Sequence, residues 1–91
     1  MNSIRILGRE YKVKKKKLKT GPNYTIFGET IYRKHEIHLH TDNGRDQDSE
    51  TLFHEIFHVV STLTGSRMTE KQVTAMSSGI FSVLKDNKKL F

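Results

Sequence analysis

The stretch DSETLFHEIFHVVSTL, residues 48–63, decides the fold of this chain. Placed at 100° per residue, its apolar side chains fall within an arc of roughly 160°, which predicts an amphipathic helix with a wide core-facing surface. Acidic and serine residues crowd its start at about Asp46 or Asp48, and Gly65 follows its end after Leu63. The core-facing arc comprises Leu52, Phe53, Ile56, Phe57, Val59, Val60 and Leu63.

Two histidines on the opposite face of this helix have the spacing of metal ligands. His54 and His58 are four residues apart, so both imidazoles can reach one ion. Zinc suits histidine and carboxylate ligands, and the chain has no cysteine. Glu55 would lie beside the water that zinc activates and can accept its proton as a general base. The pattern predicts hydrolysis of peptide bonds, although two histidines on a solvent-facing helix would look the same.

A zinc site needs a third protein ligand, and few candidates follow His58. Glu70 and Asp86 are the acidic residues downstream, and no later histidine exists. We favour Glu70, because a turn through Gly65 brings a second helix back beside the first. The helix dipole alone also stabilises a glutamate in a first helical turn, so an electrostatic role stays open for Glu70.

Thr69-Glu-Lys-Gln72 is a capping box, which predicts the start of a second helix. The charged run from Asp86 to Lys89 ends it. Its buried stripe is predicted to comprise Val73, Met76, Ile80, Val83 and Leu84.

Short β patterns precede the helices. Ile4–Ile6 and Tyr11–Val13 alternate around Gly8, which predicts a hairpin. A third candidate strand, 24–27, follows the turn residues 20–23.

A fourth strand is predicted from Thr30 to His40, with Ile37 and Leu39 on its buried face. We therefore expect an α+β fold in which a small N-terminal antiparallel sheet precedes two packed helices, in one domain spanning residues 1–91.

Upstream histidines are alternative metal ligands. His38 and His40 are two residues apart and share one strand face, and His35 is close by. An exposed polar face explains them equally well. Tyr32 and Arg67, like His38 and His40, are candidates for stabilising an oxyanion, and the sequence does not select among them.

Positive charge is concentrated in the first half of the chain. Residues 1–45 carry 11 Lys and Arg against 4 Asp and Glu, a net charge of +7, whereas residues 46–91 carry 5 against 6. The focus is a basic run that comprises Lys12, Lys14, Lys15, Lys16, Lys17 and Lys19. Such a run can bind nucleic acid phosphates. We favour a solvated edge strand, because no aromatic residue is interleaved from Lys14 to Lys19.

Membrane insertion and secretion are not expected. No segment approaches the roughly 20 apolar residues that span a bilayer, and residues 1–8 lack the apolar run of a signal peptide. A cytoplasmic protein is the default expectation.

The motif region resembles the small HExxH zinc peptidases of the gluzincin type, especially the phage-associated and ImmA/IrrE-like group. The resemblance is carried by TLFHEIFH at 51–58, EKQV at 70–73 and SVLKDN at 82–87. It covers most of residues 30–87, whereas residues 1–29 match only loosely. By resemblance, a minimal zincin-like fold is implied, with a peptide substrate aligned along an edge strand.

Carried over residue by residue, the resemblance implies His54, His58 and Glu70 as zinc ligands and Glu55 as the catalytic base. Phage-associated members often act on repressors, which makes a regulatory protein the implied substrate. Two departures limit this inference: Ser61 and Thr64 exclude the metzincin pattern, and the chain has no substrate-binding lobe. The alternatives to a zinc metalloendopeptidase are a non-catalytic metal-binding regulatory protein and a basic nucleic-acid-binding module.

Overall fold

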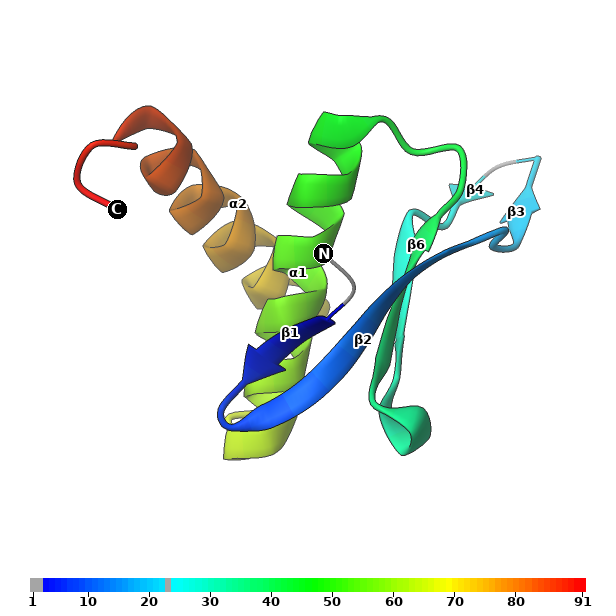
Figure 1. Ribbon diagram of the computed structural model, residues 1–91, viewed down its shortest axis with the longest axis horizontal. Helices are drawn as coiled ribbons and strands as arrows, with labels where there is room; N and C mark the ends of the chain where they lie inside the picture. The colour runs from blue at the N-terminus through cyan, green and yellow to red at the C-terminus, as the bar shows by residue number, and fades with distance from the viewer. Residues whose placement is uncertain (1–2, 23) are drawn as a thin grey trace.

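A mixed four-stranded sheet forms one side of the structure, and helix α1 lies between this sheet and helix α2 (Figure 1). The computed structural model describes residues 3–22 and 24–91. The sheet comprises β1 (Ser3–Ile6), β2 (Arg9–Lys16), β5 (Gly28–Ile31) and β6 (Glu36–His40), in the order β1-β2-β6-β5. The other elements are the short pair β3 (Thr20–Gly21) and β4 (Tyr24–Thr25), a 3₁₀ turn η1 (Tyr32–Lys34), α1 (Arg45–Thr64) and α2 (Glu70–Asp86). The predicted α+β class is confirmed.

One strand pair departs from the predicted antiparallel sheet. β1 and β2 form the expected hairpin, and β5 is antiparallel to β6. β2 and β6, however, are parallel, with Lys12 opposite Glu36 and Lys16 opposite His40. A parallel pair needs a long connection, and residues 17–35 supply it through β3, β4 and β5. The sheet is therefore mixed.

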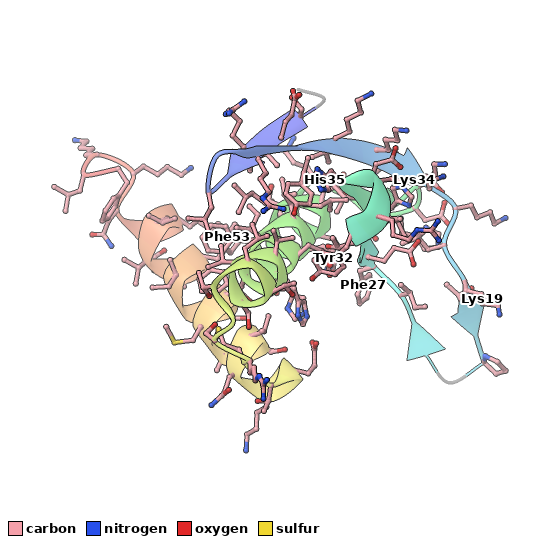
Figure 2. All side chains as sticks on the ribbon, turned by 90° about the horizontal axis from the view of Figure 1, so that it is seen from below. Lys19, Phe27, Tyr32, Lys34, His35 and Phe53 are labelled. Atoms are coloured by element: carbon pink, nitrogen blue, oxygen red, sulfur yellow. The ribbon has the colours of Figure 1, made fainter. Side chains whose placement is uncertain are left out.

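The strand predicted from Thr30 to His40 is wrong, because this segment contains the end of β5, the η1 turn and β6. His35 adopts a left-handed conformation with φ 53°, and its N–H bonds the carbonyl oxygen of Tyr32. Figure 2 shows Tyr32, Lys34 and His35 at this turn. Neither glycine nor proline marks the reversal in the sequence, so the usual turn signal was missing.

The β3–β4 ladder is a shorter structure than the third strand predicted over 24–27. Thr20 pairs with Thr25 and Gly21 with Tyr24, and the ladder ends there. Asn23, which belongs to the predicted turn 20–23, lies outside the described residues.

The core lies between the sheet and α1. Its buried members are Ile6, Tyr11, Ile37, Leu39 and Val59, and Leu52, Ile56, Val60 and Leu63 of α1 pack against them. Phe53 and Phe57 belong to the predicted arc, but Phe53 lies toward α2, with ring centroids 5.9 Å from Phe81 and 5.4 Å from Phe57. The apolar arc of α1 therefore contacts both the sheet and α2.

α2 packs mainly against α1, and this contact leaves much of its apolar stripe uncovered (Figure 1). Val73 is buried, whereas Met76, Ile80 and Val83 are 49%, 39% and 47% exposed. The prediction of a fully buried stripe is wrong for these three residues, because a single helix covers only a narrow strip of its neighbour. Within residues 3–22 and 24–91, the structure has no helix long and apolar enough to cross a membrane.

Candidate metal centre

α1 brings the two motif histidines together on its face toward α2 and β5. His54 and His58 are partly buried, their ring centroids are 4.8 Å apart, and their Nε2 atoms are separated by 3.1 Å. Residues four apart on a helix stack on one face, which explains this approach. Both imidazoles direct the same ring nitrogen to the same point.

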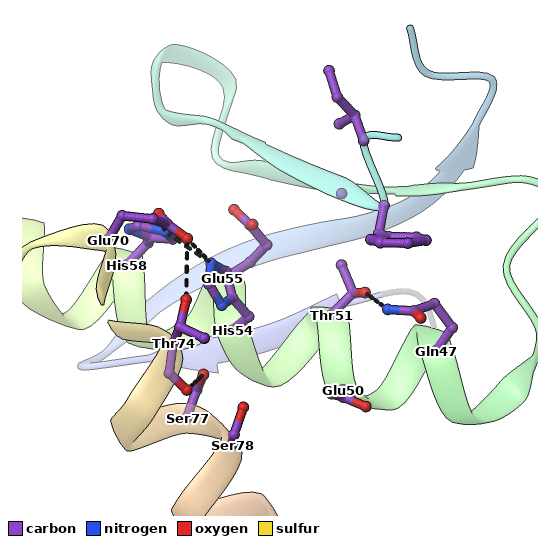
Figure 3. A pocket seen from close by; sticks show the side chains of 13 residues that line it. Gln47, Glu50, Thr51, His54, Glu55, His58, Glu70, Thr74, Ser77 and Ser78 are labelled. Atoms are coloured by element: carbon purple, nitrogen blue, oxygen red, sulfur yellow. Dashed lines mark hydrogen bonds and ion pairs between the residues drawn. The ribbon is translucent and has the colours of Figure 1, made fainter. Parts of the chain in front are cut away.

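Glu70 completes a convergent set of three donors. Its Oε2 lies 2.8 Å from Nε2 of His54, and its Oε1 lies 2.8 Å from Nε2 of His58 (Figure 3). This carboxylate is 67% exposed, at the first turn of α2. The structure thus places Glu70 against both histidines, as the sequence predicted.

The turn between the helices explains why Glu70 reaches α1. Gly65 ends α1 in a left-handed conformation with φ 69°, which glycine adopts without strain. The buried Ser61 hydroxyl accepts a hydrogen bond of 2.8 Å from the Met68 N–H, which ties the incoming chain to α1. The predicted capping box then starts α2, because Thr69 and Gln72 each accept the other's backbone N–H.

The donor set fits a zinc ion. A tetrahedral site with bonds of roughly 2.0–2.1 Å places its ligand atoms about 3.3–3.4 Å apart. The two Nε2 atoms lie 3.1 Å apart and each lies 2.8 Å from a different oxygen of Glu70, so the side chains need to spread by only a few tenths of an ångström. Without a metal ion the arrangement is unfavourable. If both Nε2 atoms carried a proton and donated it to Glu70, the two N–H groups would also face each other across 3.1 Å. A cation satisfies all three lone pairs.

Glu55 is a second carboxylate near the imidazoles, and its surroundings differ. It is 8% exposed, and its donor oxygen lies within 4.8 Å of the two histidine donor atoms. The Thr30 hydroxyl donates a hydrogen bond of 2.7 Å to its Oε1. Glu70 is closer to both imidazoles than Glu55 is, and His54, Glu55 and His58 also form a group that could hold a metal ion.

Thr30 was not anticipated from the sequence. It faces α1 because it pairs with the core residue Ile37 across the β5–β6 ladder. Gly28 shares that face, and a Cβ there would lie only 2.5 Å from Thr51 Cγ2 and 3.0 Å from the His38 carbonyl oxygen. Glycine therefore lets β5 approach α1 closely enough for Thr30 to reach Glu55.

A cavity of about 490 Å³ opens beside the donor set (Figure 3). One wall is the chain from Ile26 to Gly28, and the others come from α1 and the first turns of α2. β5 is an edge strand of the sheet, since it pairs only with β6 among the described strands. An open strand edge and the donor set therefore border the same cavity.

The upstream histidines lie elsewhere. Ile37 and Leu39 face α1, so His38 and His40 point to the opposite face of the sheet. His40 accepts a hydrogen bond of 3.1 Å from the Asp42 N–H, and His35 lies against Tyr11. The structure does not bring these three histidines to the donor set.

His38 belongs to a charged cluster on that opposite face. Its Nε2 lies 2.8 Å from Glu36 and its Nδ1 lies 3.4 Å from Glu29. The Lys14 ammonium donates a hydrogen bond of 2.9 Å to Glu36. Mainly through this bond, and also through His38, the pKa of Glu36 is lowered from 4.5 to about 2.

Of the residues considered as oxyanion stabilisers, Tyr32 lies nearest the motif face of α1. Its hydroxyl accepts a hydrogen bond of 3.2 Å from Thr62. Thr62 is one helical turn beyond His58, on the same face of α1. Arg67 lies in the turn between the helices, with a left-handed φ of 55°.

The basic run is an edge strand only in part. Its first four lysines lie on β2, which pairs with β6 from Lys12 to Lys16 but with the described part of β1 only as far as Lys12. Lys14 pairs with Glu36, and Lys15 pairs with Asp48 at 2.6 Å. Two of the six lysines are thus engaged within the chain.

Comparison with protein-family models, curated proteins and solved structures finds no match for this chain. The geometry of the centre therefore carries the functional argument.

Proposed function

We propose that this chain is a zinc-dependent metalloendopeptidase of the gluzincin type, related to the phage-associated and ImmA/IrrE-like group by its motifs. In this proposal His54, His58 and Glu70 hold the metal, and Glu55 is the general base. The observation that carries it is the convergence of two imidazole nitrogens and the two oxygens of the Glu70 carboxylate, with contacts of 2.8–3.1 Å, beside a second, separately held carboxylate.

The chain's own groups account for the proton transfers. A zinc ion supplies Lewis acidity, which activates water and polarises a carbonyl group. Thr30 occupies Oε1 of Glu55, which leaves Oε2 to accept the proton of the attacking water and pass it to the leaving amine. The Tyr32 hydroxyl is our candidate for stabilising the oxyanion, because it contacts Thr62, which lies one turn beyond His58 on α1.

A peptide fits the cavity better than a compact small molecule. An extended peptide can add to the open edge of β5 through main-chain hydrogen bonds. Because Thr30 of β5 contacts Glu55, such a peptide would pass beside the general base. The resemblance adds a regulatory protein as substrate, and the expectation of a cytoplasmic location comes from the sequence alone; both are parts of the proposal.

A non-catalytic metal-binding protein is the main rival. Its site would need the three ligands but no further carboxylate held at the same place. The hydrogen bond that fixes Glu55 favours the catalytic alternative.

The test combines metal content with one substitution. We expect about one zinc per chain by elemental analysis, thermal stabilisation by added zinc, and cleavage of peptides from a proteome-derived library. Glu55→Gln should retain zinc and cut the same peptides roughly 100-fold more slowly or worse, because an amide cannot accept the proton. Asp86→Asn, at the far end of α2, is the matched control and should cut at the wild-type rate.

Each outcome separates the alternatives. Absence of zinc would remove the metal centre, and full activity of Glu55→Gln would remove Glu55 as the base. A wild-type protein that holds zinc and cuts nothing in the library would favour the non-catalytic rival.

A further inference from the structure

A second groove lies on the other flank of α1 and is lined from β2, away from the β5 edge. It has a volume of about 1070 Å³ and lies between β2 and the first turns of α1. The residues that matter for its chemistry are Lys12, Val13, Lys16, Leu39, Asp48 and Leu52. None of these residues belongs to the metal centre, so the groove is a separate surface.

Among the described residues, one backbone edge of β2 has no partner strand beyond Lys12. β6 pairs with Lys12–Lys16, whereas β1, described from Ser3 onward, pairs with Arg9–Lys12 (Figure 1). Lys12 donates to His35 and Lys16 accepts from Thr41, and both bonds lie on the β6 side. By alternation, the N–H and C=O groups of Val13 and Lys15 point to the other side. Among the described residues, no strand lies beside them there.

An acceptor in the groove lacks a donor. Asp48 Oδ2 bonds the Lys15 ammonium at 2.6 Å, but Oδ1 is buried without a hydrogen-bond partner within the described part of the chain. The Lys15–Asp48 ion pair holds the start of α1 against β2 beside this groove.

Charge and apolar surface define the occupant. Val13, Leu39 and Leu52 offer apolar contact within the groove, while Lys12 and Lys16 line it with positive charge. We propose that an extended, acidic segment of a partner protein pairs with β2 at Val13–Lys16 and places its carboxylates against these lysines. This inference goes beyond the proposed peptidase activity and does not depend on zinc.

A protein strand suits this groove better than a nucleic acid strand. No aromatic residue lines it, so bases would lack a stacking surface. The lysines of β2 also alternate between the two faces of the sheet, whereas a strand edge is a specific partner for a peptide backbone.

The probe is a fluorescent seven-residue peptide of alternating glutamate and valine, added to the Glu55→Gln protein so that cleavage cannot interfere. We expect saturable binding and at least about tenfold slower amide hydrogen exchange at Lys15. Two N-methylated versions, one at the glutamates and one at the valines, should differ, because only one pattern blocks the N–H groups that face β2.

Two charge-matched double variants complete the test. Lys12→Glu/Lys16→Glu should bind the peptide about tenfold more weakly, whereas Lys88→Glu/Lys89→Glu, with the same change in net charge, should bind it as the wild type does.

Absence of binding would overturn the proposal, as would equal binding of both methylated peptides or of a lysine–valine peptide. Tighter binding of a twelve-nucleotide oligothymidine at the same residues would replace it with a nucleic-acid groove.

Discussion

Two clusters of histidine and glutamate lie on opposite sides of the sheet, and they use the same side chains differently. On the α1 side, Nε2 of His54, Nε2 of His58 and the Glu70 carboxylate converge on one point. On the outer face, the two nitrogens of His38 bond two different carboxylates, those of Glu29 and Glu36. Nitrogens on opposite edges of one ring cannot bind one ion together. The presence of histidine and glutamate is therefore not enough for a candidate metal site; their lone pairs must also converge on one point.

The spacing of the histidines explains the difference. Four residues on a helix stack two side chains on one face, whereas two residues on a strand place them side by side along the sheet. Each strand histidine then takes its own partner: His38 has the glutamates and His40 has the Asp42 N–H. Lys14 adds a cation to the outer cluster and balances Glu36.

Removing Glu70 should have the largest effect on this contrast. We expect Glu70→Ala to weaken zinc binding by more than about 100-fold, because loss of even an outer-shell partner costs about 10–100-fold. Asp86→Ala, which removes the other downstream acid, should leave zinc affinity unchanged. Competition with a chromophoric chelator measures both. If both variants bound zinc with near-wild-type affinity, Glu70 would have only a helix-dipole role, and His38 and His40 would become the candidate ligands.

Substitution of Thr30, on the α1 side, should have a smaller effect and tests a single hydrogen bond. Thr30→Val keeps the size of the side chain but removes the donor to Glu55, so kcat should fall about tenfold while KM and zinc content stay the same. Thr30→Ser restores a hydroxyl and should recover most of the rate. If the serine variant were as slow as the valine variant, Thr30 would act through packing and not through the hydrogen bond.

We expect the smallest effect for the outer cluster. It should appear as a change with pH in the free energy of unfolding. Because the folded-state pKa of Glu36 is lowered from 4.5 to about 2, its contribution is fully present above pH 4.5 and is lost as pH falls through about 2. Glu36→Gln should therefore unfold at lower urea concentration than wild type at pH 6, and the gap should narrow toward pH 2.5. Both proteins keep His54, His58 and Glu70, so the difference isolates Glu36. A gap that stays constant with pH would contradict the assignment.

The helices and their motif could be predicted because their signals are local. The apolar period over 48–63, the Gly65 terminator and the Thr69–Gln72 box each act within a few residues, and α1 and α2 begin and end close to the predicted positions. The position of Glu70 followed from the same turn.

The sheet could not be predicted as well, because its pairing depends on contacts between distant residues. The reversal at His35 uses a left-handed residue that is not glycine, and the parallel pairing of β2 with β6 joins segments more than 20 residues apart. Thr30 could be assigned to Glu55 only after β5 was known as a separate strand. The exposed half of α2 was missed because the apolar pattern records which face is hydrophobic but not how much of it a neighbour covers.

The close approach at Gly28 also restricts the order in which this chain can change. Alanine at position 28 would collide with Thr51 Cγ2 at 2.5 Å, whereas Thr51→Ser removes that methyl group and keeps the hydroxyl that accepts from Gln47. The remaining contact, with the His38 carbonyl oxygen at 3.0 Å, requires only a small strand shift. A lineage can therefore gain a side chain at position 28 only after it has changed Thr51. Positions 28 and 51 therefore form an epistatic pair, in which the substitution of Thr51 must come before that of Gly28.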